Sequence, residues 1–336
     1  METILKMAAQ YYGIAASELS PLPGGHFSHV YGFHRDGQDY VLRITPPNEE
    51  IGFVEMQAIL TWMHALTAHD APVAGPILSK QGQLIERVVE RGKPYLLVAF
   101  PKAQGIRGEE LAFEQWTDAL YMRLGQTLGK LHTVAQTYTP PNPTLRRPMW
   151  DKVGNCYNET SVPDTVPPVI LEKRQAVVDY VQTLPKDKES YGLIHADFHG
   201  GNFFVDTTTN TITVFDFDDC VYGWYSMDIA MSVFDALVLY TGSDKSAFAT
   251  HFLGHYLRGY LSEKSLDRFW AAQIPYFLKL LETNIYLQVA PYHSPEDTDS
   301  WVGSFMQDRE RRIVEDIAYV DVDFAALLEK VQQQMR

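Results

Sequence analysis

One stretch of the chain, residues 191–219, concentrates polar side chains that can do chemistry between short apolar runs. Its text, YGLIHADFHGGNFFVDTTTNTITVFDFDD, has turn signals at the paired glycines and at the Thr/Asn run. These signals predict a loop, a strand, a turn and a second strand. The hairpin would bring Asn202, at its entrance, near Asp216, at its exit, with Asp197 on the loop just before. Three oxygen-bearing side chains are therefore expected to converge at one end of the hairpin.

The chemistry that suits these three side chains is phosphoryl transfer. Mg²⁺ prefers hard oxygen ligands and usually takes one or two carboxylates together with substrate phosphates and water. One amide and one carboxylate, Asn202 and Asp216, fit that requirement. The separate carboxylate of Asp197 can then accept or orient the proton of an attacking hydroxyl.

Two other interpretations of the same residues stay open at this point. Asp, Asn and Gly are the commonest turn residues, so the set is also typical of a plain polar turn between strands. His195, Asp197 and His199 alternate as ligands of a transition metal would, which predicts a metal-dependent hydrolase. The hydrolase interpretation leaves Asn202 and Asp216 without a role.

The first hundred residues predict a small lobe of sheet with one helix packed on it. Two β-rich runs in residues 20–45 meet at an Asp-Gly pair, which is a strong hairpin signal. Apolar residues recur at helical spacing over residues 50–69, and two further runs in residues 83–100 predict a second hairpin. A short amphipathic helix at the N-terminus is expected to pack on a lobe.

Long helical patterns dominate the chain after residue 100, apart from the stretch 191–219. The Pro-rich segment 139–148 is interpreted as a surface excursion between helices. We therefore expect an α+β protein with two domains, an N-terminal nucleotide-binding lobe over residues 1–100 and a catalytic and substrate-binding lobe over residues 101–336.

The composition restricts the class of partner. The chain has 336 residues, a formal net charge of −14 and two cysteines, neither in a metal-binding spacing. An acidic chain without clustered Lys and Arg is not expected to bind nucleic acid or an anionic membrane. No run reaches the roughly 18 apolar residues of a membrane span, and no secretion signal is evident, so a cytoplasmic protein is expected. The sequence does not indicate an oligomeric state.

The motif HADFHGGN followed by VFDFDD resembles the aminoglycoside phosphotransferase and choline kinase superfamily, which has the protein-kinase-like fold. The resemblance implies that Asp197 is the catalytic base, that His195 supports its loop, and that Asn202 and Asp216 bind Mg²⁺. It also implies ATP as the phosphoryl donor and a buried aspartate, Asp228, that holds the catalytic loop. A kinase-like module that binds nucleotide without turnover is the remaining alternative.

The resemblance also assigns roles in the small lobe. A glycine turn at Gly24 and Gly25 would cover the phosphates, Arg43 would supply a cation, and Glu55 would orient that cation. Strand alternation places Val41 on the same face as Arg43, so Val41 is expected to contact adenine.

The junction after residue 100 is expected to hold adenine through backbone groups. Pro101 has no N–H to donate, so the acceptor is predicted to be the carbonyl of Ala99 and the donor the amide of Lys102.

The acceptor site is expected to begin after the metal-binding stretch, where Asp218, Asp219 and Trp224 could hold a cationic group by charge and by cation–π contact. Glu282 is a further acidic candidate on a later helix. The sequence of the segment LIHADFHGGNFFVD resembles that of the homoserine kinase branch of the superfamily more than that of the antibiotic kinases. This resemblance favours a small hydroxyl substrate such as an amino alcohol or a homoserine-like amino acid.

Overall fold

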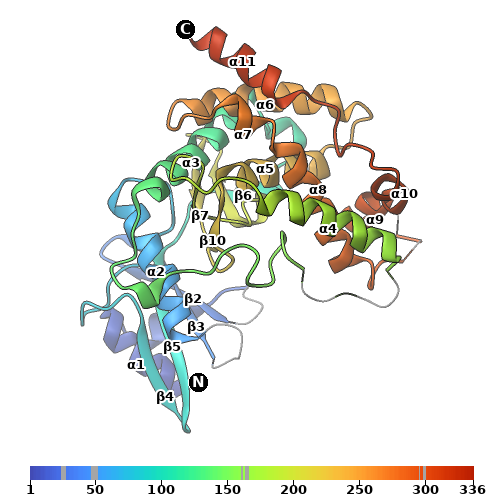
Figure 1. Cartoon of the computed structure of the whole chain (residues 1–336). Helices are drawn as coiled ribbons and strands as arrows, with labels where there is room; N and C mark the ends of the chain where they lie inside the picture. The colour runs from blue at the N-terminus through green and yellow to red at the C-terminus, as the bar shows by residue number, and fades with distance from the viewer. Residues whose placement is uncertain (24–27, 47–51, 160–161, 163–165, 295, 298–299) are drawn as a thin grey trace. The chain divides into compact units, whose positions relative to one another are not determined.

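The structure is a computed structural model that describes the whole chain except residues 24–27, 47–51, 160–161, 163–165, 295 and 298–299 (Figure 1). The chain divides into two compact units, each made of three segments. Unit 1 comprises Met1–Gly105, Thr139–Arg147 and Thr213–Asp218. Unit 2 comprises Ile106–Tyr138, Pro148–Ile212 and Asp219–Arg336.

Unit 1 is built on a five-stranded antiparallel sheet with the order β1-β2-β3-β5-β4. Its strands and the two helices of the unit have the following bounds: α1 Glu2–Tyr12, β1 Ser20–Pro21, β2 His29–Arg35, β3 Gln38–Thr45, α2 Phe53–Ala68, β4 Glu86–Glu90 and β5 Lys93–Pro101. Figure 1 draws these elements in blue to cyan.

Two tight turns set the register of this sheet. Asp36 and Gly37 have φ of 52° and 79°, and Arg91 and Gly92 have φ of 50° and 79°. Positive φ at both central residues is the geometry of the two-residue hairpin turn that matches strand twist. Both predicted hairpins are thereby confirmed, and so is the helix predicted over residues 50–69, which begins at Phe53 among the described residues.

The core of unit 1 forms between the sheet and α1. Ile4, Ala8 and Tyr12 on α1 are buried against Leu42 and Ile44 of β3, in one cluster with other sheet residues. Leu42 and Ile44 are fully buried on one face of β3, while Val41 and Arg43 on the other face are half-buried. The predicted N-terminal helix is therefore confirmed as a packed part of the fold.

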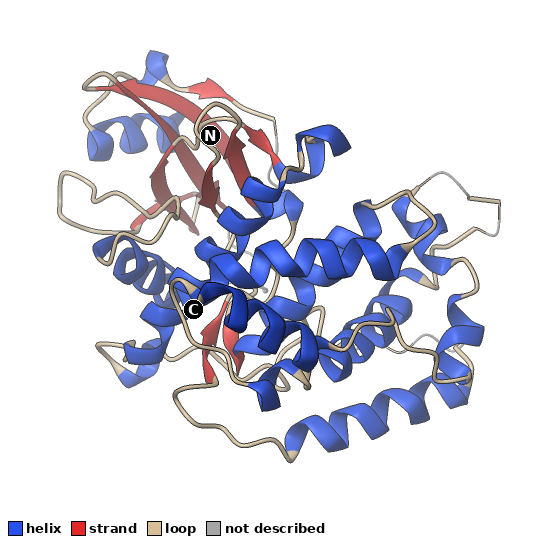
Figure 2. Cartoon of the chain, turned by 90° about the horizontal axis from the view of Figure 1, so that it is seen from above, coloured by secondary structure: helices blue, strands red, loops and turns tan. Residues whose placement is uncertain are grey.

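Unit 2 is mainly helical. Figure 2 draws the helices of the whole chain in blue and its strands in red. Helices α3 and α6 pack along each other, α5 and α4 pack on α8, and α11 packs on α6. The helices are α3 Asp118–Thr137, α4 Pro168–Gln182, α5 Tyr225–Leu239, α6 Lys245–Leu261, α7 Arg268–Ala271, α8 Ile274–Val289, α9 Trp301–Met306, α10 Arg309–Val314 and α11 Phe324–Met335.

Two small sheets lie among these helices. Strand β7, Tyr191–Ile194, pairs antiparallel with β10, Val221–Trp224. The second sheet has the order β6-β8-β9, with β6 Ile106–Arg107, β8 Phe203–Asp206 and β9 Thr211–Val214. The predicted strand-turn-strand after the catalytic-loop motif is therefore present as β8 and β9. In the described part of the chain no helix combines the length and apolar character that a membrane crossing requires.

Candidate active site

The loop that follows β7 carries the HADFHGGN motif, and a buried carboxylate anchors its start. The Asp228 carboxylate accepts from the backbone N–H of His195 and of Ala196, each at 2.8 Å. Asp228 lies in the first turn of α5 and is fully buried. A carboxylate that accepts two backbone N–H groups fixes the direction of the chain as it leaves the strand, which is the role that the resemblance implies for this aspartate.

The same carboxylate is also bonded to His132 on α3, whose Nε2 lies 3.1 Å from Asp228 Oδ2. Burial lowers the pKa of His132 even though the hydrogen bond and charge of Asp228 act to raise it. The ring is therefore neutral near pH 7, with its proton on Nε2. Its Nδ1 then accepts from the hydroxyl of Tyr260 at 2.9 Å. The anchor of the loop is thus itself held by two helices.

A strained residue follows the anchor and receives a thiol hydrogen bond. Ala196 has a φ of 67°, a left-handed conformation that costs a non-glycine residue about 1–2 kcal/mol. The Cys156 thiol donates to the Ala196 carbonyl at 2.9 Å and lies 3.9 Å from Asp197 Oδ1. Burial, with the charge of Asp197, raises the pKa of Cys156 well above its usual range, so it remains a thiol and a donor. Sequence reasoning missed this contact.

Asp197 and Asn202 face each other across the loop. The Asn202 Nδ2 donates to the Asp197 carbonyl at 2.9 Å and to Asp197 Oδ2 at 2.7 Å. These contacts engage the amide nitrogen of Asn202 and leave its oxygen as the group to present to a cation. The donor chemistry of the buried Asn202 amide therefore fits the ligand role predicted for it.

His199 controls the ionisation of Asp197. Its Nε2 lies 3.4 Å from Asp197 Oδ2. Burial alone would raise the pKa of Asp197, but hydrogen bonds and charge from His199, with His195 and Asn202, hold it below its usual value. Burial would lower the pKa of His199, but the hydrogen bond and charge of Asp197, with nearby carboxylates, raise it to about 9. Asp197 is thus held as a carboxylate beside the Nε2–H of His199, whose Nδ1 accepts from the N–H of Gly201 at 3.0 Å.

A second carboxylate, the half-buried Asp235 of α5, supports the turn of the loop. Its Oδ2 accepts from the N–H of Gly200 at 2.9 Å. Burial raises the pKa of Asp235 to about 6, against the charge of His199 and the Gly200 hydrogen bond, which lower it.

The ring of His195, predicted to support the loop, is buried and its Nδ1 accepts from the N–H of Asp197 at 3.3 Å. The loop is therefore held by side chains along its length.

In unit 1 the predicted cation, Arg43, forms an ion pair with Asp218. Arg43 Nη1 lies 3.2 Å from Asp218 Oδ2, and both side chains are partly exposed. Asp218 was predicted to hold the acceptor, and in the structure its carboxylate is engaged by Arg43, which belongs to the same compact unit.

The predicted partner of Arg43, Glu55 on α2, is bonded to a different arginine. Arg147 Nη1 donates to Glu55 Oε1 at 2.8 Å, and Arg147 Nη2 donates to the Asp218 carbonyl at 2.7 Å. Residues 139–146 are mostly exposed, as predicted for a surface excursion, whereas Arg147 at the end of this segment is only 6% exposed, and the segment belongs to unit 1. A buried arginine thus joins α2 to the segment that carries Asp216 and Asp218.

Asp216 lies two residues after β9 with its side chain exposed and a φ of 61°. The preceding strand end is fixed in unit 1 by the N–H of Val214, which donates to the Pro72 carbonyl at 2.9 Å, and by the Val214 carbonyl, which accepts from Ala74. Asp tolerates the left-handed conformation better than most residues. An exposed carboxylate on a fixed backbone is a hard oxygen donor suited to Mg²⁺.

The residues predicted to hold adenine are found in different environments. Val41 is half-buried on the same face of β3 as Arg43. The Ala99 carbonyl accepts from the N–H of Ile77 at 2.9 Å and keeps a second lone pair. The Lys102 N–H donates to the Asp39 carbonyl at 2.9 Å. The single proton of this N–H is therefore shared with the sheet, and the role of Lys102 as adenine donor stays a prediction. Gly24 and Gly25 lie outside the described residues.

Two of the predicted acceptor residues are structural. Trp224 is fully buried, its Nε1 donates to the Pro185 carbonyl at 2.8 Å, and its ring packs edge-on against Tyr191. The prediction that Trp224 contacts a substrate is a misassignment, because this aromatic belongs to the core. Glu282 is 2% exposed and bonded to Arg309, so it too is internal. Asp219 is exposed just before β10.

The geometry does not favour the hydrolase interpretation. Among the residues that the structure describes, the group of three His, Cys, Asp or Glu side chains with ligand atoms close enough for a metal is Asp118, His251 and His255. Among these residues, the ligand atoms of His195, Asp197 and His199 do not form such a group.

Comparison with known proteins gives the class of this chain. Residues 18–270 match the model of the phosphotransferase enzyme family. Amicoumacin kinase from Bacillus subtilis (strain 168) is 32% identical over 288 residues, which cover 85% of this chain and 83% of that protein. The structure of amicoumacin kinase hAmiN in complex with AMP-PNP, Ca²⁺ and Ami is 27% identical with a TM-score of 0.84, covering 97% of this chain and 96% of that chain.

A third protein, known from its solved structure, is similar to this chain in fold only. The structure of the microcompartment-associated aminopropanol kinase is 22% identical with a TM-score of 0.70, covering 97% of this chain and 99% of that chain. The chain belongs to the phosphotransferase enzyme family and is an enzyme of the small-molecule kinase class. The predicted family, α+β kinase-like fold and kinase activity are thereby confirmed, and the hydrolase and non-catalytic alternatives are not.

Proposed function

We propose that the enzyme transfers the γ-phosphoryl group of ATP to a hydroxyl of a small molecule, with Asp197 as the residue that orients this hydroxyl. The observation that carries the proposal is the position of the Asp197 carboxylate, held by Asn202 and His199 on a loop whose start is anchored to Asp228. AMP-PNP, an ATP analogue, is present in the related amicoumacin kinase structure and supports ATP as the donor.

Asn202 and Asp216 would hold the divalent cation, which we expect to be Mg²⁺. When bound, the cation supplies neutralising charge to the phosphate oxygens. The amide nitrogen of Asn202 donates to Asp197, which sets the direction of its oxygen, and the exposed Asp216 carboxylate supplies the negative ligand. The Ca²⁺ of the related amicoumacin kinase structure supports a divalent cation.

The contribution of the protein is mainly alignment. Phosphoryl transfer passes through a loose transition state, in which the bond to the leaving oxygen is largely broken before the bond to the attacking oxygen forms. The attacking hydroxyl therefore keeps its proton until late in the reaction, and a strong base is not needed. Asp197 therefore needs to be ionised and fixed rather than strongly basic, which agrees with a pKa below its usual value. In unit 1 we propose that Arg43 and Val41 serve the nucleotide, with Arg43 toward phosphate.

The acceptor is proposed to carry an amine as well as the hydroxyl. The net charge of −14 and the exposed Asp219 just before β10 favour a cationic molecule. The relation to amicoumacin kinase makes amicoumacin one candidate, and amino alcohols or homoserine-like amino acids form the second group. Nucleic acid and membrane are not expected to be partners, and a cytoplasmic location remains a prediction.

The test is acceptor-dependent ADP release by the full chain with ATP and Mg²⁺, across amicoumacin, aminopropanol, homoserine, choline and aminoglycosides. With an active acceptor, Asp197→Asn is expected to lower turnover by about 10²- to 10⁴-fold with unchanged circular dichroism. The matched control is Asp179→Asn on the exposed surface of α4. Near-normal turnover of Asp197→Asn would remove Asp197 from this role, and uniform inactivity across the panel would reject the acceptor class.

A further inference from the structure

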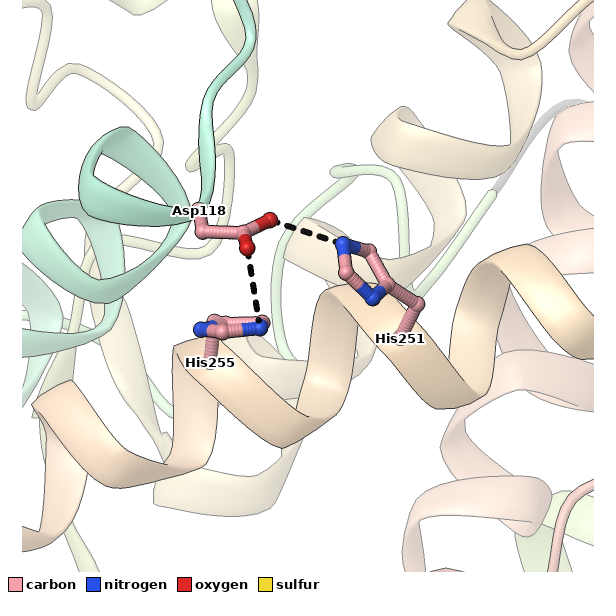
Figure 3. Close-up of side chains that lie close together, drawn as sticks. All are labelled: Asp118, His251 and His255. Carbon is pink, nitrogen blue, oxygen red and sulfur yellow. Dashed lines mark hydrogen bonds and ion pairs between the residues drawn. The ribbon is translucent and has the colours of Figure 1, made fainter.

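A second group of ligand-bearing side chains lies in unit 2, apart from the candidate active site. Asp118 is the first residue of α3, and His251 and His255 lie one turn apart on α6. Figure 3 shows both imidazoles turned toward the single carboxylate between them. One ligand atom from each residue lies within 4.8 Å of the other two.

The distances in this group are close to those of a metal coordination shell. His251 Nε2 lies 2.7 Å from Asp118 Oδ1, and His255 Nε2 lies 3.4 Å from Asp118 Oδ2. Ligands at about 2.0–2.2 Å from a tetrahedral Zn²⁺ lie about 3.3–3.5 Å from one another. The His255–Asp118 pair already has this spacing, and the His251–Asp118 pair must open by roughly 0.7 Å. A carboxylate that binds through one oxygen must also turn, because the two imidazoles face different oxygens of Asp118. The exposed side chains have room for that shift.

The helices that carry the three ligands are locked together. A Cβ atom added at Gly125 of α3 would lie 1.9 Å from the Tyr256 carbonyl oxygen, and one added at Gly259 of α6 would lie 1.8 Å from the Met122 carbonyl oxygen. The two backbones therefore touch, and only glycine fits at these points. On α6 this contact begins beside His255, and on α3 it begins at Met122, one turn after Asp118, so the ligands sit on a rigid frame.

We propose that Asp118, His251 and His255 form a site for a first-row divalent transition metal, with Zn²⁺ as the expected occupant. Two imidazoles one helical turn apart and one carboxylate are a ligand set that Zn²⁺ accepts, and water would complete the tetrahedron. The site differs from the predicted Mg²⁺ site in its ligand chemistry, because imidazole favours transition metals and Mg²⁺ favours oxygen.

Occupancy would join the start of α3 to α6. A metal that binds only the folded chain raises the free energy of unfolding, and this increase grows with the logarithm of the ratio of metal concentration to Kd. For a chain of this size we expect the Tm to rise by roughly 5 °C at a hundredfold excess over the Kd. Helix α3 also carries His132, which is bonded to the anchor of the catalytic loop.

The experiment is calorimetric titration of the metal-free full-length protein with Zn²⁺ in the absence of nucleotide and Mg²⁺, followed by the Tm with and without the metal. We expect one Zn²⁺ per chain and at least a tenfold loss of affinity in His251→Ala and in His255→Ala. Co²⁺ should give the visible absorption of a tetrahedral site in the wild type and lose it in both variants.

The matched control is His34→Ala, which removes an exposed His–Asp pair, His34 Nδ1 to Asp39 Oδ1 at 2.8 Å. Within the described part of the chain this pair has no third ligand beside it. This variant should bind Zn²⁺ as the wild type does. Three outcomes would overturn the proposal. The wild-type protein binds no Zn²⁺, or the His251→Ala and His255→Ala variants bind Zn²⁺ as tightly as the wild type. The third is that His34→Ala loses as much Zn²⁺ affinity as those two variants. Kinase turnover with ATP and Mg²⁺ should be unchanged in all three variants.

Discussion

The catalytic loop of unit 2 and the charged cluster of unit 1 hold their functional side chains in opposite ways. The loop is fixed by a fully buried carboxylate, Asp228, that accepts from two backbone N–H groups and is itself supported by His132. The cluster is held by side-chain ion pairs of Arg43 and Arg147, whose acidic partners are partly exposed. Buried bonds to backbone give a rigid loop, while ion pairs reached by water can rearrange.

The largest effect is expected at the anchor of the loop. Asp228→Ala would leave the N–H groups of His195 and Ala196 and the Nε2–H of His132 buried without an acceptor. Unmet buried donors cost about 1–3 kcal/mol each, so the free energy of unfolding should fall by about 3–5 kcal/mol. A misplaced Asp197 should lower turnover by about 10²-fold in protein that still folds.

Urea unfolding followed by circular dichroism measures this loss, with Asp179→Ala on exposed α4 as the control that should change stability by less than about 0.5 kcal/mol. If the two variants are equally stable, the loop is not held by Asp228, and the contrast between a rigid loop and an adjustable cluster fails.

A smaller effect is expected at Arg147, which forms both a side-chain ion pair with Glu55 and a hydrogen bond to the backbone carbonyl of Asp218. Arg147→Met removes the bonds to Glu55 and to the Asp218 carbonyl and leaves a partly exposed carboxylate, so unfolding should become easier by about 1–3 kcal/mol. Arg146→Met, at the exposed neighbour, is the matched control. A double-mutant cycle with Glu55→Gln should give a coupling of about 0.5–3 kcal/mol. A coupling near zero would mean that Arg147 acts by packing alone.

The parts of this site that could be predicted are those set by local sequence. The turns at Asp36-Gly37 and Arg91-Gly92 require positive φ, which the residue types themselves reveal. Asp197 and Asn202 lie five residues apart on one loop, so their contact follows from the motif. The family resemblance added Asp228, which lies 33 residues after His195, too far along the chain for a local sequence pattern to predict their contact.

The parts that could not be predicted depend on packing between distant segments. Arg147 meets Glu55 across 92 residues, and its Pro-rich surroundings are typical of a surface loop. Cys156 reaches Asp197 across 41 residues with no metal or redox spacing to mark it. Trp224 was assigned to the substrate because an aromatic beside an acidic run has the same composition whether it lines a site or, as here, fills the core.

The smallest effect on stability is expected at Arg43, and it provides the sharpest contrast between the two regions. Its ion pair with Asp218 has separations of 3.2–3.4 Å and is reached by water, so Arg43→Gln should change the free energy of unfolding by less than about 1 kcal/mol. If Arg43 turns to phosphate when ATP binds, the lost charge-assisted bond is worth about 1.5–3 kcal/mol, and the KM for ATP should rise by roughly tenfold or more. Arg43→Lys should recover part of that loss, since a lysine keeps the charge but not the two-pronged geometry. Unchanged KM in Arg43→Gln, with Arg43→Lys equally unaffected, would mean that this arginine only pairs with Asp218 and that the nucleotide is held by other groups of unit 1.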